Sequence, residues 1–430
     1  MPTALELDAP HCLYPATAVV PTPAPELSED ARAETLIIGG GYTGLSTALH
    51  LAERGRSVAL LEAREPGFGA AGRNGGQVNA GLKYGPDEAE RALGSIYGPR
   101  LVTLSLRAPE FLFGLIERLG IECEASRTGT LRVGYAPAHL RALRASIDPW
   151  RRRGVPLEFW EADRVAAATG STRYLGGTFN PQGGSLNPLG LARGLARAAL
   201  EAGARLYQSS PVLALEREGA AWGARTPRAV LRAERVLIAT DGYSDDLWPG
   251  LRQSTVPIYS AIIATAPLPP DLAASILPDR PVVYESGQIT TYYRRDAAGR
   301  LLMGGRGLQR NATNPEDYRH LVSYARRLWP ALTRVEWTHW WNGQFALMPD
   351  FLPRFHHPEP RLYIFLGYSG RGLALSSAIG AELAAVLAGA PAESFALPVS
   401  PVRRIPLHRF WRLGVKTRVA YGRLLDRFGR

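Results

Sequence analysis

The chain has 430 residues, of which 46% are hydrophobic, and its formal net charge is +11. This length exceeds what one hydrophobic core normally organises, so we expect two or three domains. The basic residues are almost all arginines scattered beside acidic residues, which argues against a nucleic-acid partner. The two cysteines, Cys12 and Cys123, form neither a metal-binding nor a disulfide pattern, so we predict no metal site.

The N-terminal region does not read as a signal peptide, because its first basic residue is Arg32 and prolines interrupt the early apolar stretch. The most apolar helix is predicted over residues 374–390 and contains Glu382. It is short and polar for a membrane span, which favours a buried core helix. We therefore expect a cytoplasmic protein.

In chain order, the Pro-rich residues 1–32 precede an apolar strand predicted over 35–38. A helix follows over 44–54, and a second buried strand over 57–61 ends at Glu62. The pattern predicts one strand–helix–strand unit with parallel strands.

Later segments return to the same sheet. We predict a helix over 189–202, short strands near 206 and at 211–213, a buried strand over 235–239, and a strand over 362–366 before a helix from Gly372. Residues 96–180 mix helices with irregular stretches, and residues 251–345 alternate apolar and polar side chains as antiparallel strands do.

These segments predict an α/β fold in which a Rossmann-type dinucleotide domain is interrupted by a second, α+β domain with a mixed or antiparallel sheet. We assign residues 1–95, 181–250 and 346–430 to the dinucleotide domain. We assign residues 96–180 and 251–345 to the second domain, which we expect to bind the substrate.

Gly39, Gly41 and Gly44 give a G-x-G-x-x-G pattern between the first strand and the first helix. The three glycines permit a tight turn, close approach of a diphosphate to the backbone, and close packing of helix on strand. The helix N-terminus offers free N–H groups to the diphosphate. Glu62 stands at the end of the second strand, where a carboxylate accepts hydrogen bonds from a ribose diol.

Two further glycine-rich stretches favour FAD over NAD. Residues 67–77 contain one cation, Arg73, which can meet a phosphate or a flavin. Residues 367–372 form a turn before a helix, whose N-terminus would favour negative charge on a reduced flavin; an ordinary strand–helix connection fits this turn equally well. No second G-x-G-x-x-G follows a strand, so electrons are expected to come from the substrate, as in an oxidase or dehydrogenase.

Six stretches of the chain carry a family pattern: 11–18, 37–45, 69–77, 239–244, 292–294 with 304–306, and 367–372. Together they resemble the D-amino-acid oxidase-like family of FAD-dependent oxidoreductases, most of all its γ-glutamylputrescine oxidoreductase branch. Ala71 stands where the branch has a serine, and Arg371 where histidine is frequent.

The resemblance implies an FAD domain and a substrate domain over the flavin. It also implies oxidation of a C–N bond of an amine or amino acid, by hydride transfer to flavin N5 and hydrolysis of the imine. A γ-glutamylputrescine-like amine is the favoured substrate, and oxygen or another acceptor takes the electrons. The FAD is expected to be non-covalent, because neither cysteine lies near the flavin turn. The expected cofactor-binding residues are Gly39, Gly41, Tyr42, Thr43, Gly44, Glu62, Arg73, Asn74, Gly75, Gly76, Gln77, Val212, Thr240, Gly367, Ser369, Gly370, Arg371 and Gly372.

Arg73, Tyr292 and Arg371 are the candidate catalytic residues beside flavin and substrate. A larger group of aromatic residues could either line the substrate pocket or pack in the core, and the sequence leaves both roles open. These residues are Tyr284, Tyr292, Tyr293, Trp337, Trp340 and Trp341. Arg294 or Arg306 either holds a substrate carboxylate or serves the structure. Sarcosine-oxidase-like relatives use a lysine beside the flavin. Neither Lys83 nor Lys416 stands at the position in the chain where those relatives have that lysine.

Two alternatives remain from the sequence. One is a D-amino-acid, glycine or sarcosine-type dehydrogenase that passes electrons to a membrane acceptor; the other is a non-catalytic flavin-binding protein. The basic, aromatic tail over residues 403–430 would either touch a membrane surface or pack on the FAD domain.

Overall fold

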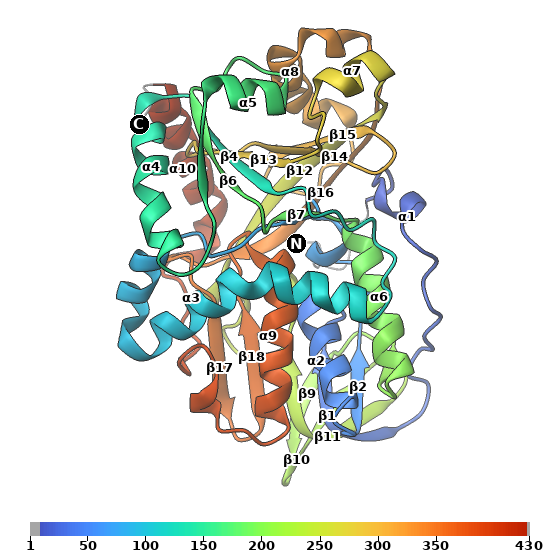
Figure 1. Ribbon diagram of the computed structural model, residues 1–430. Coiled ribbons are helices and arrows are strands. Elements are labelled where there is room, and N and C mark those ends of the chain that lie inside the picture. Colours follow the sequence, from blue (N-terminus) through green and yellow to red (C-terminus); the bar gives the residue numbers. More distant parts are fainter. Residues whose placement is uncertain (1–8, 428–430) are drawn as a thin grey trace.

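The computed structural model describes residues 9–427 (Figure 1). Residues 1–8 and 428–430, the outer ends of the expected segments 1–95 and 346–430, lie outside the described residues. Two eight-stranded sheets organise the chain, one in the lower and one in the upper half of Figure 1. Among the described helices, none combines the length and the hydropathy that a transmembrane segment requires.

The first sheet has the order β17-β18-β11-β1-β2-β8, and its strands from β18 to β8 run parallel. The β9–β10 hairpin pairs with residues 230–233 of β11, along the edge where β18 pairs with residues 236–238. The strands are β1 (Ala31–Ile38), β2 (Val58–Leu61), β8 (Arg205–Tyr207), β9 (Ala214–Glu218), β10 (Ala221–Arg225), β11 (Val230–Ile238), β17 (Arg354–Glu359) and β18 (Leu362–Leu366). The predicted parallel unit at the N-terminus is confirmed, and its apolar runs are buried because both faces of the sheet are covered.

Helices cover one face of this sheet: α2 (Tyr42–Ala52), α3 (Pro86–Arg118), α6 (Pro188–Glu201) and α9 (Gly372–Leu387). The other face carries the β9–β10 hairpin and the N-terminal stretch around Leu27. The core helix that we predicted over 374–390 is confirmed as α9, which is buried along most of its length.

The second sheet has the order β16-β12-β15-β14-β13-β4-β6-β5, and all its pairs are antiparallel except β13 with β4. The antiparallel strands predicted within 251–345 are confirmed. The strands are β4 (Thr130–Gly134), β5 (Glu158–Glu161), β6 (Gly176–Asn180), β12 (Val256–Pro267), β13 (Val282–Glu285), β14 (Tyr292–Arg295), β15 (Arg300–Arg306) and β16 (Trp337–Leu347).

The two faces of the second sheet differ. One face packs against helices that sit at the top of Figure 1: α5 (Ala162–Thr169), α7 (Pro270–Ser275) and α8 (Arg319–Leu328). The other face looks toward the first sheet and receives the short helix α1 (Tyr14–Thr17). A two-stranded ladder of β3 (Gln77–Val78) and β7 (Gly184–Ser185) lies between the sheets, and α4 (Pro137–Arg151) flanks the second one.

Two helices pack against a different sheet from the one that our expected domain boundaries gave them. Leu101, Leu112 and Ile116 of α3, which fall within 96–180, pack into the same core as α2 and α9. The last helix, α10 (Trp411–Arg427), lies against the β13–β14 loop of the second sheet and not on the first sheet. Periodicity shows that a helix has an apolar face but does not show which partner covers it. We therefore propose that residues 86–121 belong with the first sheet and α10 with the second.

Candidate flavin and substrate site

The first glycine turn joins β1 to α2. Gly39 adopts a φ of +111°, and a Cβ atom there would lie 2.9 Å from the carbonyl oxygen of Ala239. A Cβ atom on Gly44 would lie only 2.0 Å from the carbonyl oxygen of Gly39. Gly41 caps α2, and a Cβ atom there would meet only the Cβ of Ala71, at 4.0 Å. The turn itself requires the first and last glycines, whereas Gly41 keeps space open before the helix N-terminus.

Glu62 lies beside this turn. Its Oε2 accepts a hydrogen bond from the Gly40 N–H at 2.6 Å, and its Oε1 accepts one from the Arg64 N–H at 2.9 Å. Burial raises the pKa of the Glu62 carboxyl. Each carboxylate oxygen keeps further acceptor capacity, so the side chain can fix the turn and also accept hydrogen bonds from a ligand diol.

The loop over residues 67–77 holds Arg73 in a buried position. The Arg73 Nε donates to the Phe68 carbonyl oxygen at 2.8 Å, and the guanidinium lies 4.5 Å from the centroid of the Phe68 ring. Its Nη1 is buried and has no hydrogen-bond partner among the described residues. A buried guanidinium nitrogen without an acceptor indicates a place where a ligand acceptor belongs.

Asn74 and Tyr42 shape the same loop. The Asn74 Nδ2 donates to the Ala71 carbonyl oxygen at 2.9 Å, and its Oδ1 accepts from the Gly76 N–H at 2.9 Å. The Tyr42 hydroxyl is 2.6 Å from the Ala71 carbonyl oxygen. These polar groups are satisfied within the protein and position the loop, and direct contacts of Asn74 and Tyr42 with FAD stay predictions.

Arg294 fastens the loop to the second sheet. Its Nε donates to the Gly75 carbonyl oxygen at 2.7 Å, and its Nη2 donates to the Leu186 carbonyl oxygen at 3.1 Å. The Leu186 N–H in turn donates to the Gly76 carbonyl oxygen at 2.9 Å. Of the two roles that we left open for Arg294, the structural one therefore matches its contacts.

The second glycine turn, over residues 367–372, leads from β18 into α9. Gly367 and Gly370 adopt φ values of +96° and +85°. Thr43 Oγ1, on the first turn of α2, lies 2.6 Å from the Tyr368 hydroxyl oxygen and so links the two glycine turns. Ser369 is buried, with its N–H donating to the Ala346 carbonyl oxygen at 3.1 Å.

Asp241, within the family stretch 239–244, is a positioning residue whose role the sequence did not reveal. Its Oδ1 accepts from the Gly367 N–H at 2.8 Å, and its Oδ2 accepts from the Ala346 N–H at 3.3 Å. Burial raises the pKa of this carboxyl. It ties the end of β16 to the second glycine turn, and its place just beyond a buried parallel strand is the signal that could have identified it.

One row of side chains crosses the face of the second sheet that looks toward these turns. Consecutive strands place its members opposite one another, so they share one face: Arg132, Tyr284, Tyr292, Gly304, Ile262 and Trp341. A Cβ atom on Gly304 would lie 2.2 Å from the Tyr292 ring, so this glycine makes room for the tyrosine. The row passes from a charged end through aromatic rings to an apolar end.

The loops of the first sheet contact both ends of this row. Trp341 Nε1 donates to the Arg73 carbonyl oxygen at 3.0 Å at the apolar end. The Arg371 guanidinium lies 4.9 Å from the centroid of the Tyr284 ring near the charged end. Of the other aromatic candidates, Tyr293, Trp337 and Trp340 pack with the core on the opposite face.

A cationic cluster surrounds the charged end of the row. We define it as Lys83, Arg132, Arg306, Arg371 and Arg418. Lys83 is exposed to water over much of its surface. Partial loss of hydration, and then the charges of the four arginines, lower the pKa of Lys83 to about 8. Lys83 therefore lies near Arg371, although its position in the chain did not indicate this.

The same positive charges act on Tyr284. Burial alone would raise the pKa of its phenol, but the charges of Arg371 and Arg132 outweigh burial and lower it. No salt bridge between described residues includes a member of the cationic cluster. An accumulation of like charges that form no salt bridge with a protein carboxylate is expected where an anion binds.

The remaining predicted positions lie around the same edge. Thr240 Oγ1 is 2.7 Å from Ser244 Oγ, and its methyl group stands beside Gly39. Gln77 Nε2 donates to the Val283 carbonyl oxygen at 3.4 Å, and Val212 is half-buried against the first sheet. Their contacts with FAD stay predictions.

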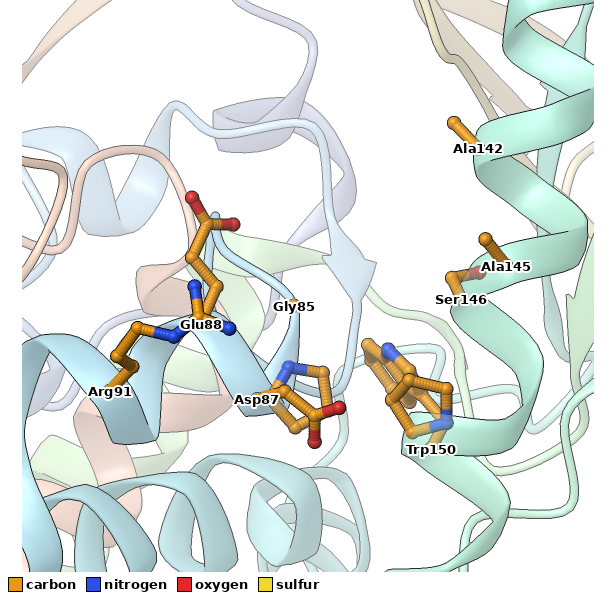
Figure 2. Close-up of a pocket in the computed structure, with 10 residues that line it drawn as sticks. Gly85, Asp87, Glu88, Arg91, Ala142, Ala145, Ser146 and Trp150 are labelled. Atoms are coloured by element: carbon orange, nitrogen blue, oxygen red, sulfur yellow. The ribbon is translucent and has the colours of Figure 1, made fainter.

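Two hollows lie outside the glycine turns. One, of about 790 Å³, borders the cationic cluster at Arg306 and is also lined by Tyr135, Arg423 and Asp426. The other, of about 270 Å³, lies between the start of α3 and the second half of α4, with Asp87 facing Trp150 (Figure 2). None of the predicted site residues lines the smaller hollow, so we give it no role in cofactor binding.

A helix N-terminus with open space before it, a carboxylate beside that turn, and a buried arginine without an acceptor fit an adenine dinucleotide with a flavin. A family model described as "FAD dependent oxidoreductase" (DAO) matches residues 34–386. The chain belongs to this family, and it is an FAD-dependent oxidoreductase. Its resemblance to that family is thereby confirmed, and the alternative of a non-catalytic flavin-binding protein is not supported.

Relatives extend the match over nearly the whole chain. The γ-glutamylputrescine oxidoreductase of Escherichia coli is 33% identical over 427 residues, which cover 97% of this chain and 98% of the relative. A probable oxidoreductase OrdL of Rhizobium meliloti is 35% identical over 366 residues, covering 84% and 85%. The crystal structure of glycine oxidase from Geobacillus kaustophilus superposes with a TM-score of 0.72 at 23% identity, covering 87% of this chain and 99% of that one, and confirms the fold.

Proposed function

We propose that this chain oxidises the C–N bond of a primary or secondary amine that carries a carboxylate at its other end, as γ-glutamylputrescine does. The observation that carries this proposal is the row on the second sheet, whose charged end meets a cationic cluster that forms no salt bridge among the described residues. The name of the Escherichia coli relative supports it independently.

We assign the adenosine diphosphate half of FAD to the first glycine turn and Glu62, and the flavin half to residues 73–77 and 367–372. When bound, FAD supplies the acceptor for the hydride of the amine carbon, and water then hydrolyses the resulting imine to a carbonyl and an amine or ammonia. The protein positions the substrate relative to the flavin. The cationic cluster holds the carboxylate, while Tyr284 and Tyr292 form the walls beside the amine chain.

The reacting amine lies at the end of the substrate away from the cationic cluster, beside the ring of Tyr292. Loss of hydration there makes an ammonium lose its proton more readily, because burial disfavours the charged form. The amine is then neutral and its lone pair is available, so the protein needs no general base for the oxidation. Arg73, Tyr292 and Arg371 therefore act by placing substrate and cofactor rather than by proton transfer.

Product analysis of the holoenzyme tests this proposal. With γ-glutamylputrescine we expect an aldehyde and ammonia, detected by mass spectrometry and an ammonia assay. N-acetylputrescine has the same reacting amine but lacks the whole amino-acid head, both its carboxylate and its ammonium. It should react at least about 10-fold less efficiently, because the charge-assisted pair of the carboxylate is worth about 1.5–3 kcal/mol. Turnover of glycine, sarcosine or D-alanine in preference to both amides would overturn it.

The second candidate, a glycine or sarcosine-type dehydrogenase that delivers electrons to a membrane acceptor, is favoured by one observation, the exposed basic and apolar surface of α10. Reoxidation by air, compared with reoxidation by a quinone analogue, separates oxygen from such an acceptor. The cytoplasmic location expected from the sequence stays a prediction.

A further inference from the structure

Helix α10 presents an apolar stripe to solvent. Phe410, just before the helix, and Leu413, Tyr421 and Leu424 within it are 50%, 61%, 58% and 49% exposed. Their spacing places them on one side of a helix with 3.6 residues per turn. We call these four residues the apolar stripe. Exposed apolar residues gathered on one face mark an interaction surface more often than single ones do.

The opposite side of α10 is attached to the second sheet. Asp426 accepts hydrogen bonds from the Gln288 N–H at 2.7 Å and the Ile289 N–H at 3.1 Å. Arg418 Nη2 donates to Gln288 Oε1 at 2.9 Å, and Gly422 packs against the same loop. These contacts fix which side of the helix faces outward, so the apolar stripe is a defined surface.

A basic flank runs beside the apolar stripe. The helical period places Arg409, Arg412, Lys416 and Arg423 next to it, and all four are exposed. Residues 403–427 contain eight basic residues and one acidic residue, a net charge of +7 within a chain whose net charge is +11. The single acid, Asp426, is hydrogen-bonded to the β13–β14 loop. No salt bridge between described residues includes a basic residue of this segment.

We propose that α10 docks on an anionic lipid bilayer, with the apolar stripe in the interfacial region and the basic flank on the lipid headgroups. A helix with an exposed apolar face, a strongly basic neighbouring face and moderate overall hydropathy is suited to lie in the plane of a membrane surface. A second copy of the chain is a poorer occupant, because two segments of net charge +7 repel each other. This inference does not rest on the proposed substrate.

Co-sedimentation of the holoenzyme with vesicles tests the proposal. We expect binding to vesicles of mixed phosphatidylcholine and phosphatidylglycerol, little binding to phosphatidylcholine alone, and loss of binding at high salt. The triple variant Leu413→Ser, Tyr421→Ser, Leu424→Ser should bind at least about 10-fold more weakly, since each buried apolar side chain contributes more than about 1 kcal/mol. The matched control is Val20→Ser, Ile96→Ser, Leu213→Ser, which alters side chains that are 88%, 61% and 63% exposed elsewhere.

The basic flank has its own variant. Arg409→Gln, Arg412→Gln and Lys416→Gln together should weaken binding to anionic vesicles roughly 100-fold. Arg107→Gln, Arg141→Gln and Arg326→Gln change the net charge equally on other exposed helices and should leave binding unchanged. Equal loss in both charge variants, or equal binding to neutral vesicles, would overturn the proposal. So would a stripe-dependent dimer in sedimentation velocity without vesicle binding, because the occupant would then be a second copy.

Discussion

The two sheets approach the reaction site with different chemistry. The first sheet contributes mainly glycine turns, helix N-termini and backbone groups, braced by Glu62, and its loops add the side chains of Arg73 and Arg371. The second sheet contributes side chains: a row from Arg132 through Tyr284 and Tyr292 to Trp341. Cofactor recognition here depends on the path of the backbone, whereas substrate recognition depends on which side chains a register brings together.

The two sheets are sensitive to different substitutions. A glycine turn is disrupted when a side chain is added, because the backbone leaves no space for it. The row on the second sheet loses substrate recognition when a charge or ring is removed, while the fold around it survives. Substitutions can therefore separate the contributions of the two sheets.

Gly44→Ala should be the most damaging single change. The added Cβ would lie 2.0 Å from the Gly39 carbonyl oxygen, a backbone atom that cannot move without opening the β1–α2 turn. We expect the free energy of unfolding to fall by about 3 kcal/mol or more and FAD to be lost. Denaturant unfolding and the flavin content of the purified protein measure both.

Gly41→Ala is the matched comparison within the same turn. Its Cβ would meet only the Ala71 Cβ at 4.0 Å, so we expect a stability within about 1 kcal/mol of the parent. FAD affinity should still fall, because the methyl group occupies the approach to the helix N-terminus. Equal destabilisation by both substitutions would contradict the distinction between turn and ligand space.

Glu62→Ala should weaken FAD retention about 10- to 100-fold. The substitution removes the acceptor for the Gly40 and Arg64 N–H groups, and with it the predicted contact to the ribose. Glu65→Ala changes the same charge at an exposed neighbouring position and should retain FAD. Reconstitution of apoprotein with FAD measures the dissociation constants, and unchanged affinity in Glu62→Ala would disprove the ribose assignment.

Lys83 should give the substrate preference a pH dependence. Because the pKa of Lys83 is lowered to about 8, its ammonium is charged below that pH and neutral above it. The ratio of kcat/KM for γ-glutamylputrescine to that for N-acetylputrescine should therefore fall as the pH rises through about 8, and taking the ratio cancels the titration of the shared amine.

Two variants sharpen this test. Lys83→Met should lower the ratio about 10-fold at neutral pH and make it independent of pH, while Lys83→Arg should keep it high to more alkaline pH. A ratio that does not change with pH in the parent enzyme would show that Lys83 does not hold the carboxylate.

Tyr292→Phe should have the smallest effect. The ring stays between Gly75 and Gly304, and only the hydrogen bond of the hydroxyl to Ser260 Oγ at 2.9 Å is lost. We expect a loss of about 1 kcal/mol in stability and a change of a few-fold in kcat. A decrease in kcat beyond about 100-fold would mean that the hydroxyl takes part in the chemistry.

The sequence was informative for the first sheet and less so for the second. Residues 31–62 could be predicted because local signals coincide: an apolar run, glycines at fixed spacing and a carboxylate at the end of the next strand. Arg132, Tyr284 and Tyr292 lie on separate strands, and their alignment follows from strand register, which no local pattern encodes. The packing of α3 on the first sheet was not predicted for a similar reason. The sequence shows that a helix has an apolar face but not which element that face packs against.

The most direct measurement is an anaerobic titration of the holoenzyme, followed by the visible absorption of the flavin, in the parent and in Lys83→Met. We predict that γ-glutamylputrescine bleaches the parent flavin at concentrations about 10-fold below those needed for N-acetylputrescine or for the variant. Bleaching by both amides at the same concentration, or by neither while an amino acid such as glycine succeeds, would contradict the carboxylate site on the second sheet.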